Sequence, residues 1–266
     1  MASKSGPDRD PASPARPLEI VAGEALNRPL KTAEIVAREI VRGIVSSGMR
    51  TGDPLPPESA MLEQHGVSRE SLREGLRLLE VQGLIRIRRG PGGGPMVGQV
   101  DPANFGRVST LYFHLAGASY DELFDAWVVA EAIMATRAAR YPNAAQRRTA
   151  MEPYLLPHRP EHPNDMHEFV QLHSGFHTVV ARLGRNRVIE LVLPSFGQIV
   201  SHHMMLRDDP RRLAELLEHD HRQLAEAIAT GRARQAGQLM EEHVERIVML
   251  HREHSNLDGT TIIEWL

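Results

Sequence analysis

The fold is decided by residues 55–97, which read LPPESAMLEQHGVSRESLREGLRLLEVQGLIRIRRGPGGGPMV. Pro57 suits the first position of a helix that runs to His65, because its missing N–H would have no partner there. Gly66 can take the left-handed conformation that ends many helices. Ser68 is a good N-cap for the helix that follows. The stretch therefore predicts two short helices joined by a tight turn.

The second of these helices has one basic and one apolar face. Its arginines recur every four residues and its leucines lie opposite them: Arg69, Arg73 and Arg77; Leu72, Leu76 and Leu79. A helix with this spacing buries its leucines and leaves its arginines in solvent. A recognition helix enters a DNA major groove in the same way, with its N-terminal residues toward the bases.

A two-stranded ribbon is predicted next. Residues 85–88, Ile-Arg-Ile-Arg, alternate with the period of a half-buried strand. Residues 89–95 form a glycine-rich turn, and residues 96–97 return as the second strand. A bare, arginine-flanked turn can approach a phosphate backbone or a minor groove closely. No helix follows the glycines, so a nucleotide-phosphate loop is not indicated, and the order of elements predicts winged-helix DNA binding.

Short motifs extend this pattern from the predicted helix at 30–45 to the turn: Gly52-Asp53, Leu55-Pro56-x-Glu58, Gly66-Val67-Ser68-Arg69, Leu72-Arg73-Glu74, Leu78-x-x-x-Gly83-Leu84 and Arg89-Gly90-x-Gly92-Gly93-Gly94. They resemble the winged helix-turn-helix of GntR-superfamily transcription regulators. In the FadR-type subgroup, the resemblance implies operator contacts by Arg69, Arg73 and the wing tip Arg89-Gly90. The neighbouring Ser68 and Ser71 complete the predicted DNA-binding set. A further operator-contacting arginine of that subgroup is replaced by Ser59, so a different base preference is expected.

Composition fits a soluble chain of 266 residues that is long enough for two domains. The absence of cysteine excludes disulfides and thiolate metal sites, and fits a reducing cytoplasm. No apolar run reaches the roughly 18 residues of a membrane span. The net charge of −3 divides unevenly: residues 28–100 hold 11 Lys/Arg against 8 Asp/Glu, and residues 101–266 hold 17 against 22. A basic DNA-binding module on an acidic partner domain is indicated.

Four segments are expected. Residues 1–27 form a disordered tail, rich in proline and without the apolar core of a signal peptide. Residues 28–98 form the winged helix-turn-helix domain, and residues 101–254 an all-α antiparallel bundle of about six to seven helices, so the fold is mainly α. The tail 255–266 ends too apolar to be idle and should dock on the body or on a partner subunit. The helices expected after the linker are 102–116, 119–140, 143–156, 163–183, 186–206 (kinked at Pro194), 210–229 and 232–254.

Histidines recur on the apolar stripes of three expected helices. His173 and His177 share the fourth of these, and His221 and His243 lie on the last two. One such histidine is usually an ordinary core residue, but several buried imidazoles without partners are costly. A divalent ion would give each of them a bond. Residues 173–177 lack the glutamate of the HExxH protease motif, so hydrolysis has no evident general base.

The helical segment also carries a set of matching positions: Glu131, Phe176-His177, Gly184-x-Asn186, His221-x-x-Leu224-x-x-Ala227-Ile228 and His243. These resemble the FCD domain of the FadR subfamily. The resemblance implies a divalent metal held by an aspartate and three histidines. Here His177, His221 and His243 match the histidines, and His173 stands at the position of the aspartate. Loss of the anionic ligand favours zinc or nickel over manganese.

The resemblance further implies a small-molecule effector beside the metal, commonly an organic acid. The arginine that often binds its carboxylate is replaced by Trp127. Arg137 lies on the same helical stripe but ten residues farther along, at about 1.5 Å per residue. Arg137, His202 and Asn186 are the remaining candidates for effector contact. Bulky residues such as Trp127 also leave an acyl-type effector open.

The sequence therefore predicts a homodimeric repressor, not an enzyme, that reads a double-stranded operator of approximate two-fold symmetry. Effector binding in the helical domain would release the operator. Two alternatives stay open: a regulator that senses the metal itself, and a metal-dependent hydrolase whose ion activates water. A purely structural bundle is disfavoured, because a bundle needs no buried imidazoles to fold.

Overall fold

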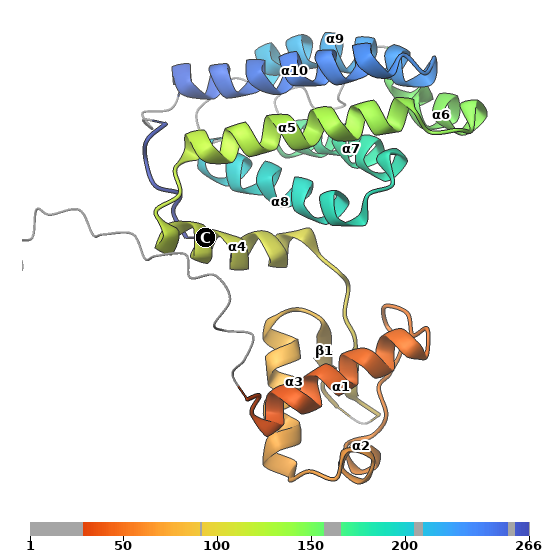
Figure 1. Ribbon diagram of the computed structural model, residues 1–266, viewed down its shortest axis with the longest axis vertical. Coiled ribbons are helices and arrows are strands. Elements are labelled where there is room, and N and C mark those ends of the chain that lie inside the picture. The colour runs from red at the N-terminus through yellow and green to blue at the C-terminus, as the bar shows by residue number, and fades with distance from the viewer. Residues whose placement is uncertain (1–28, 91, 157–165, 205–209, 255–258, 266) are drawn as a thin grey trace, which may run out of the picture.

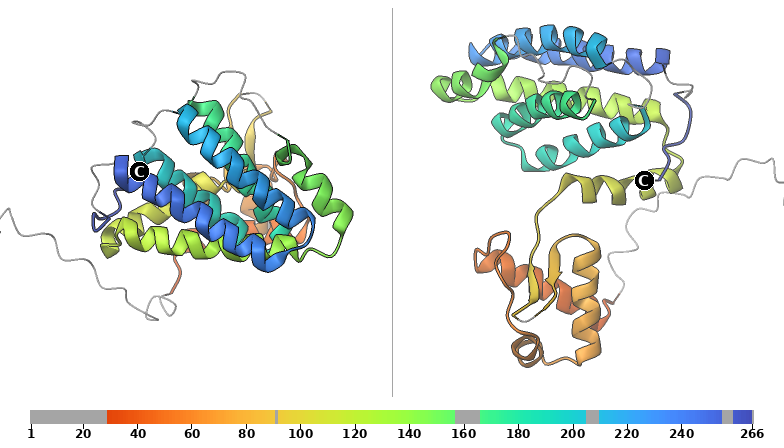
Figure 2. Two further views of the ribbon diagram at one scale, coloured as in Figure 1. Left: turned by 90° about the horizontal axis from the view of Figure 1, so that it is seen from above. Right: turned by 180° about the vertical axis from the view of Figure 1, so that it is seen from behind.

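The computed structural model describes residues 29–90, 92–156, 166–204, 210–254 and 259–265. Within them, a helical bundle and a small winged-helix domain lie at opposite ends of the molecule, with one helix, α4, on the bundle side of the linker (Figures 1 and 2). The prediction of a mainly helical fold with a two-stranded wing and a C-terminal bundle is confirmed. No helix in the described part of the chain is long and apolar enough to cross a membrane.

The winged-helix domain contains three helices and one hairpin, with these bounds: α1 Thr32–Ser46, α2 Glu58–His65, α3 Arg69–Val81, β1 Ile85–Arg88 and β2 Gly94–Val97. The strands are antiparallel, with Ile85 opposite Val97 and Arg88 opposite Gly94. The predicted leucine face of α3 is buried against α1. A Cβ at Gly75 would lie 3.0 Å from the Ala33 carbonyl oxygen, so a glycine allows this close approach.

The turn between α2 and α3 is as predicted. Gly66 ends α2 in the left-handed region at φ 62°. The Ser68 hydroxyl accepts a hydrogen bond from the backbone N–H of Ser71 and so caps α3. Two bounds were predicted wrongly. Pro57 precedes α2 as its N-cap and is not its first residue, and β2 begins at Gly94 and not at Met96.

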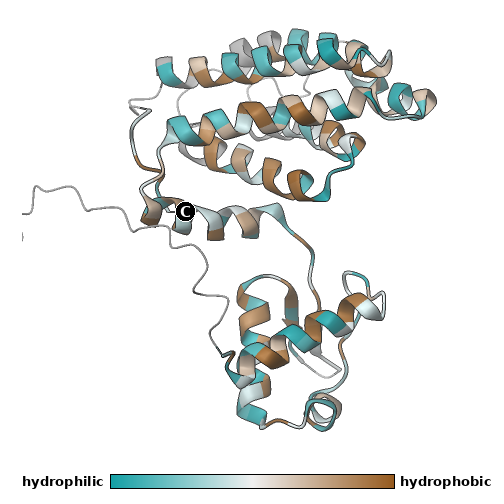
Figure 3. Ribbon diagram, in the orientation of Figure 1, coloured by the Kyte–Doolittle hydropathy of each residue, from teal (hydrophilic) through white to brown (hydrophobic). Residues whose placement is uncertain are grey.

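The bundle consists of seven described helices and one short 3-10 turn: α4 Pro102–Ala116, α5 Tyr120–Ala139, α6 Ala144–Met151, the turn Glu152–Tyr154, α7 Met166–Gly184, α8 Arg187–Met204, α9 Pro210–Ala229 and α10 Ala233–His254. Helix α5 packs on α10 and α7, and α8 packs on α4 and α7. Polar and apolar residues alternate along these helices, as expected when one side of each helix is buried (Figure 3). The predicted helix 143–156 ends early, since Pro153 cannot donate the next helical hydrogen bond.

The end of the chain docks on the bundle, as the apolar tail suggested. Ile263 is 1% exposed, and its N–H donates to the Ala118 carbonyl oxygen. The first two N–H groups of α5, from Tyr120 and Asp121, donate to the carbonyls of Thr261 and Gly259. These N–H groups have no partner inside their own helix, so the C-terminal segment 259–265 caps α5 with backbone atoms.

We expect Ile263→Ala to lower the free energy of unfolding of the helical domain by about 2–5 kcal/mol, because it empties a filled apolar site. Trp265→Ala is the matched control, since Trp265 is 62% exposed and its loss should change stability by less than about 0.5 kcal/mol. Urea unfolding followed by circular dichroism measures both. Equal effects of the two substitutions would contradict the docking of this segment.

Candidate nucleic-acid interface and metal centre

The predicted DNA-binding residues lie on two neighbouring elements of the winged-helix domain. Arg69, Arg73 and Arg77 are exposed on α3. Arg88, Arg89 and Gly90 are exposed where β1 ends, and Gly90 has φ 99°, a conformation that favours glycine. The structure thus presents a basic helix face and a basic wing, the two parts with which a winged helix contacts DNA.

One contact on α3 escaped the sequence analysis. The Nε of Arg73 donates to Oε1 of Glu58, the first residue of α2, at 3.1 Å. Both side chains are exposed, so the pair adds little stability. It fixes the direction of Arg73 while its terminal nitrogens stay available for a base or a phosphate. Ser68 and Ser71 bond to each other in the N-cap of α3.

The four predicted histidines converge inside the bundle. They come from three helices, α7, α9 and α10, and one nitrogen from each lies within 4.8 Å of the others: His173, His177, His221 and His243. Nε2 of His243 lies 3.2 Å from Nε2 of His221 and 3.4 Å from Nε2 of His177. Nitrogens at about 2.0–2.1 Å from a tetrahedral zinc ion would be separated by about 3.3 Å. The residues present therefore fit a divalent metal ion.

Two carboxylates hold the outer nitrogens of this cluster. Oε1 of Glu131, from α5, lies 2.9 Å from Nδ1 of His177. Oδ2 of Asp220 lies 3.2 Å from Nδ1 of His243, and Nε of Arg246 lies 3.2 Å from the same oxygen. A carboxylate beside Nδ1 keeps the proton there and turns the lone pair of Nε2 toward the centre. The sequence analysis quoted Glu131 without this role and missed Asp220.

The electrostatics of the site favour neutral imidazoles. Burial is the largest cause that lowers the pKa of His221, which lies well below its usual value, and the neighbouring histidines lower it further. Burial also lowers the pKa of His243, although its hydrogen bond to Asp220 opposes the shift. For Asp220, burial raises the pKa, but the bond from His243 and nearby positive charges outweigh burial and leave it lowered. Neutral imidazole is the form that binds a metal.

Aromatic and apolar side chains surround the histidines. The ring of Phe176 stacks on His221, with centroids 4.1 Å apart. Trp127 is buried, and its Nε1 donates to Oε1 of Glu131, the oxygen that also faces His177. Met240 is fully buried on α10. The site is therefore a polar cluster with a largely apolar wall.

The four candidates for effector contact have different positions. Trp127 is next to the histidine cluster through Glu131. Arg137 donates to the carbonyls of Gly184 and Arg185 at the end of α7. The Oδ1 of Asn186 accepts from two N–H groups at the start of α8 and caps that helix. The side chain of His202 lies outside the described residues. Effector binding by these residues stays a prediction.

Comparison with known families divides the chain as the structure does. A model described as "Bacterial regulatory proteins, gntR family" matches residues 32–93, and the FCD domain model matches residues 122–246. The first match covers the winged-helix domain, and the second covers the helices that carry all four histidines.

Individual relatives agree with this division. The Glc operon transcriptional activator of Escherichia coli (strain K12) is 26% identical over 174 residues, which are 63% of this chain and 66% of that protein. The uncharacterized HTH-type transcriptional regulator YcbG of Bacillus subtilis (strain 168) is 24% identical over 86% of this chain and 93% of its own length. Among solved structures, Streptococcus agalactiae GntR has a TM-score of 0.57 at 18% identity, over 81% of this chain and 98% of that one, which is a likeness of fold.

Proposed function

The chain belongs to the GntR family of transcription regulators with a C-terminal FCD domain, which are not enzymes, and we propose that it is a homodimeric repressor controlled by a small-molecule effector. Two winged helices would read an operator of approximate two-fold symmetry. An effector that prefers one conformation of the bundle would shift the dimer away from the DNA-bound form. The hydrolase alternative is set aside by the family.

The basic face of α3 supports the DNA-binding part of this proposal. Arg69 and Arg73 would contact base edges, and Arg89 and Gly90 would contact the backbone or minor groove at the wing. Glu58 holds Arg73 in one direction, so less side-chain entropy would be lost on binding. Neutralisation of phosphates by these arginines would make affinity fall steeply with salt.

An exposed apolar face on α4 supports the dimer. Its large side chains are between 40% and 68% exposed: Phe105, Val108, Tyr112 and Leu115. Large apolar side chains gathered on one exposed helix face commonly mark a protein–protein contact. Pairing of two copies through this surface would bring two winged helices onto one DNA duplex.

We expect Arg73→Ala to weaken binding to the specific operator by about 1–3 kcal/mol, or roughly tenfold to a hundredfold, because a base contact is lost. The operator is first selected from random DNA with the unaltered protein, and affinity is then measured by fluorescence anisotropy. Arg148→Ala, an exposed arginine on α6, is the control and should bind normally. Unchanged affinity in Arg73→Ala would refute the recognition-helix assignment.

The second part of the proposal is a divalent metal ion, zinc or nickel, held by the four histidines. The Nε2 spacings of 3.2 and 3.4 Å are the observation that carries it. When bound, the ion would supply a positive centre toward which an anionic effector group can turn. Glu131 and Asp220 orient two of the ligands, and Phe176 and Trp127 keep water away from them.

We expect about one ion per chain in the purified protein and almost none in His221→Ala, since that variant loses a buried ligand. Elemental analysis measures the content, and thermal unfolding should show a lower Tm for His221→Ala and for the chelated protein. His219→Ala, an exposed histidine on the same helix, should keep its ion. Full metal content in His221→Ala would dismiss the ligand set.

We expect Glu131→Gln to weaken metal affinity by about 10–100-fold, because the amide cannot hold the Nδ1 proton of His177 as a carboxylate does. Competition with a coloured chelator gives the dissociation constant. Glu226→Gln removes an exposed carboxylate of α9 and should leave the constant unchanged. If both variants bind metal equally well, Glu131 has no orienting role.

A regulator that senses the metal itself is a second candidate, favoured by the number of nitrogens. Four imidazoles complete a tetrahedral zinc site and leave no open position for an effector, as in structural zinc sites. Operator affinity measured with and without the ion, in the absence of any effector, separates the two functions. A change in affinity supports metal sensing, whereas an unchanged affinity leaves the ion as part of the effector site.

A further inference from the structure

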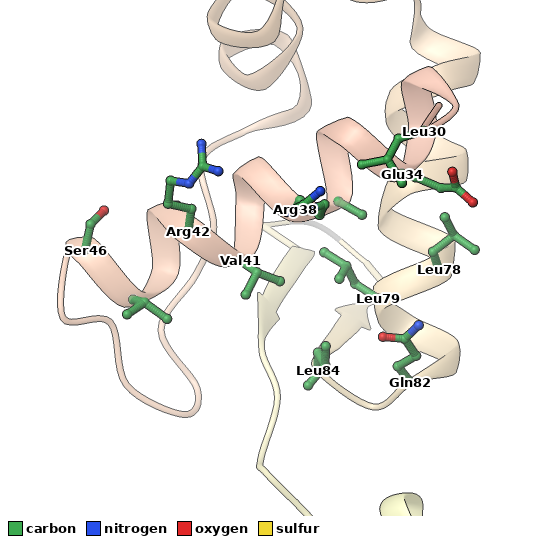
Figure 4. Close-up of a pocket in the computed structure, with 12 residues that line it drawn as sticks. Leu30, Glu34, Arg38, Val41, Arg42, Ser46, Leu78, Leu79, Gln82 and Leu84 are labelled. Carbon is green, nitrogen blue, oxygen red and sulfur yellow. The ribbon is translucent and has the colours of Figure 1, made fainter. Parts of the chain in front are cut away.

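A groove in the winged-helix domain has no part in the function proposed above. It has a volume of about 680 Å³ and lies between α1 and the C-terminal half of α3. Figure 4 shows Val41, Leu79 and Leu84 pointing into the space between the two helices. Leu30 and Val45 line it farther along α1 and are 37% and 74% exposed. Apolar surface gathered in this way marks a contact site.

The groove is long and narrow. Its residues on α1 recur every three or four positions from Leu30 to Ser46, so it follows the whole helix. At about 1.5 Å per residue, α1 is roughly 22 Å long. A groove of this shape fits a segment of polypeptide better than a compact small molecule.

Charge narrows the choice of occupant. Arg38 and Arg42 line the groove, and both are exposed. Among the described residues, neither has an ion-pair partner. An occupant with apolar side chains and carboxylates would complement both the floor and these two guanidinium groups.

The chain itself contains such a segment immediately before α1. Residues 18–26 read LEIVAGEAL, with two glutamates and neither lysine nor arginine. Asn27, Arg28 and Pro29 alone separate this segment from Leu30, which already lines the groove. Asn and Pro favour a change of chain direction. Nine extended residues span about 30 Å, which is enough to follow α1 to its end.

We propose that residues 18–26 fold back along α1 and occupy this groove. Leu18, Ile20 and Leu26 would cover the apolar floor, and Glu19 and Glu24 would face Arg38 and Arg42. The sequence analysis assigned residues 1–27 to a disordered tail, and the proposal keeps that assignment for residues 1–17 only. Because Leu78 and Leu79 belong to α3, the docked segment would brace the recognition helix at the end opposite Arg69.

Two shortened chains test the proposal. One begins at Leu18 and the other at Asn27, each after an initiator methionine, and amide hydrogen exchange is followed in α1 and in residues 78–84. We expect the chain from Leu18 to exchange like the full chain, and the chain from Asn27 to exchange about tenfold faster, a ratio equivalent to about 1.4 kcal/mol. Equal exchange in all three chains would overturn the proposal.

Charge reversal gives an independent test. Arg38→Glu with Arg42→Glu should raise exchange in residues 78–84 to the rate of the chain from Asn27. Addition of Glu19→Arg and Glu24→Arg should restore the slower rate, because the opposite charges face each other again. A general loss of stability from the reversed arginines would not be repaired by changes in residues 18–26, so failure of the rescue counts against the contact.

The absence of cysteine from the chain allows the docked copy to be identified. Ile20→Cys and Val45→Cys are combined in one chain, and the oxidised protein is separated without reductant. A disulfide within one chain supports the proposal. A disulfide that forms only between two chains would show that the groove holds a second copy's segment, and would overturn the proposal as stated.

Discussion

The convergence of three Nε2 atoms within 3.4 Å of one another constrains the rest of the bundle. Imidazoles have a large desolvation cost, and these are brought together where burial already lowers the pKa values of His221 and His243. Neutral rings at this spacing turn lone pairs toward a shared point, which a divalent cation would stabilise. Helices α7, α9 and α10 must then keep their relative rotation, because a change of one residue in any of them would move its ligand away.

Helix α5 connects this centre to the DNA-binding domain. It carries Glu131 against His177, and its first turn is capped by the C-terminal segment 259–265. The same segment bonds to Ala118 and receives His114 of α4 at the carbonyl of Ile263. At the other end of α4, a Cβ on Gly83 would lie 2.2 Å from Nδ2 of Asn104, so glycine is needed where the recognition helix ends. These packed contacts form a continuous connection from the histidines to α3.

Periodicity in the sequence predicted faces well and partners poorly. The basic and apolar faces of α3, the cap at Ser68 and the four inward histidines all follow from spacing along one helix. Asp220 is adjacent to His221 in sequence but points about 100° away around α9, toward a histidine of α10. Likewise, Glu58 meets Arg73 only because a tight turn brings α2 against α3. Such contacts depend on how helices pack, which no single helical pattern records.

The replacement of a family aspartate by His173 changes where negative charge lies. Four imidazoles contribute none at the centre, whereas an aspartate would contribute one unit directly. Glu131 and Asp220 lie one ring farther out, each beside an Nδ1 atom, and Arg246 offsets part of the charge of Asp220. An ion held by these residues would therefore keep more of its positive charge on the side open to a ligand. That arrangement favours an anionic effector over a neutral one, provided that His173 leaves a coordination position free.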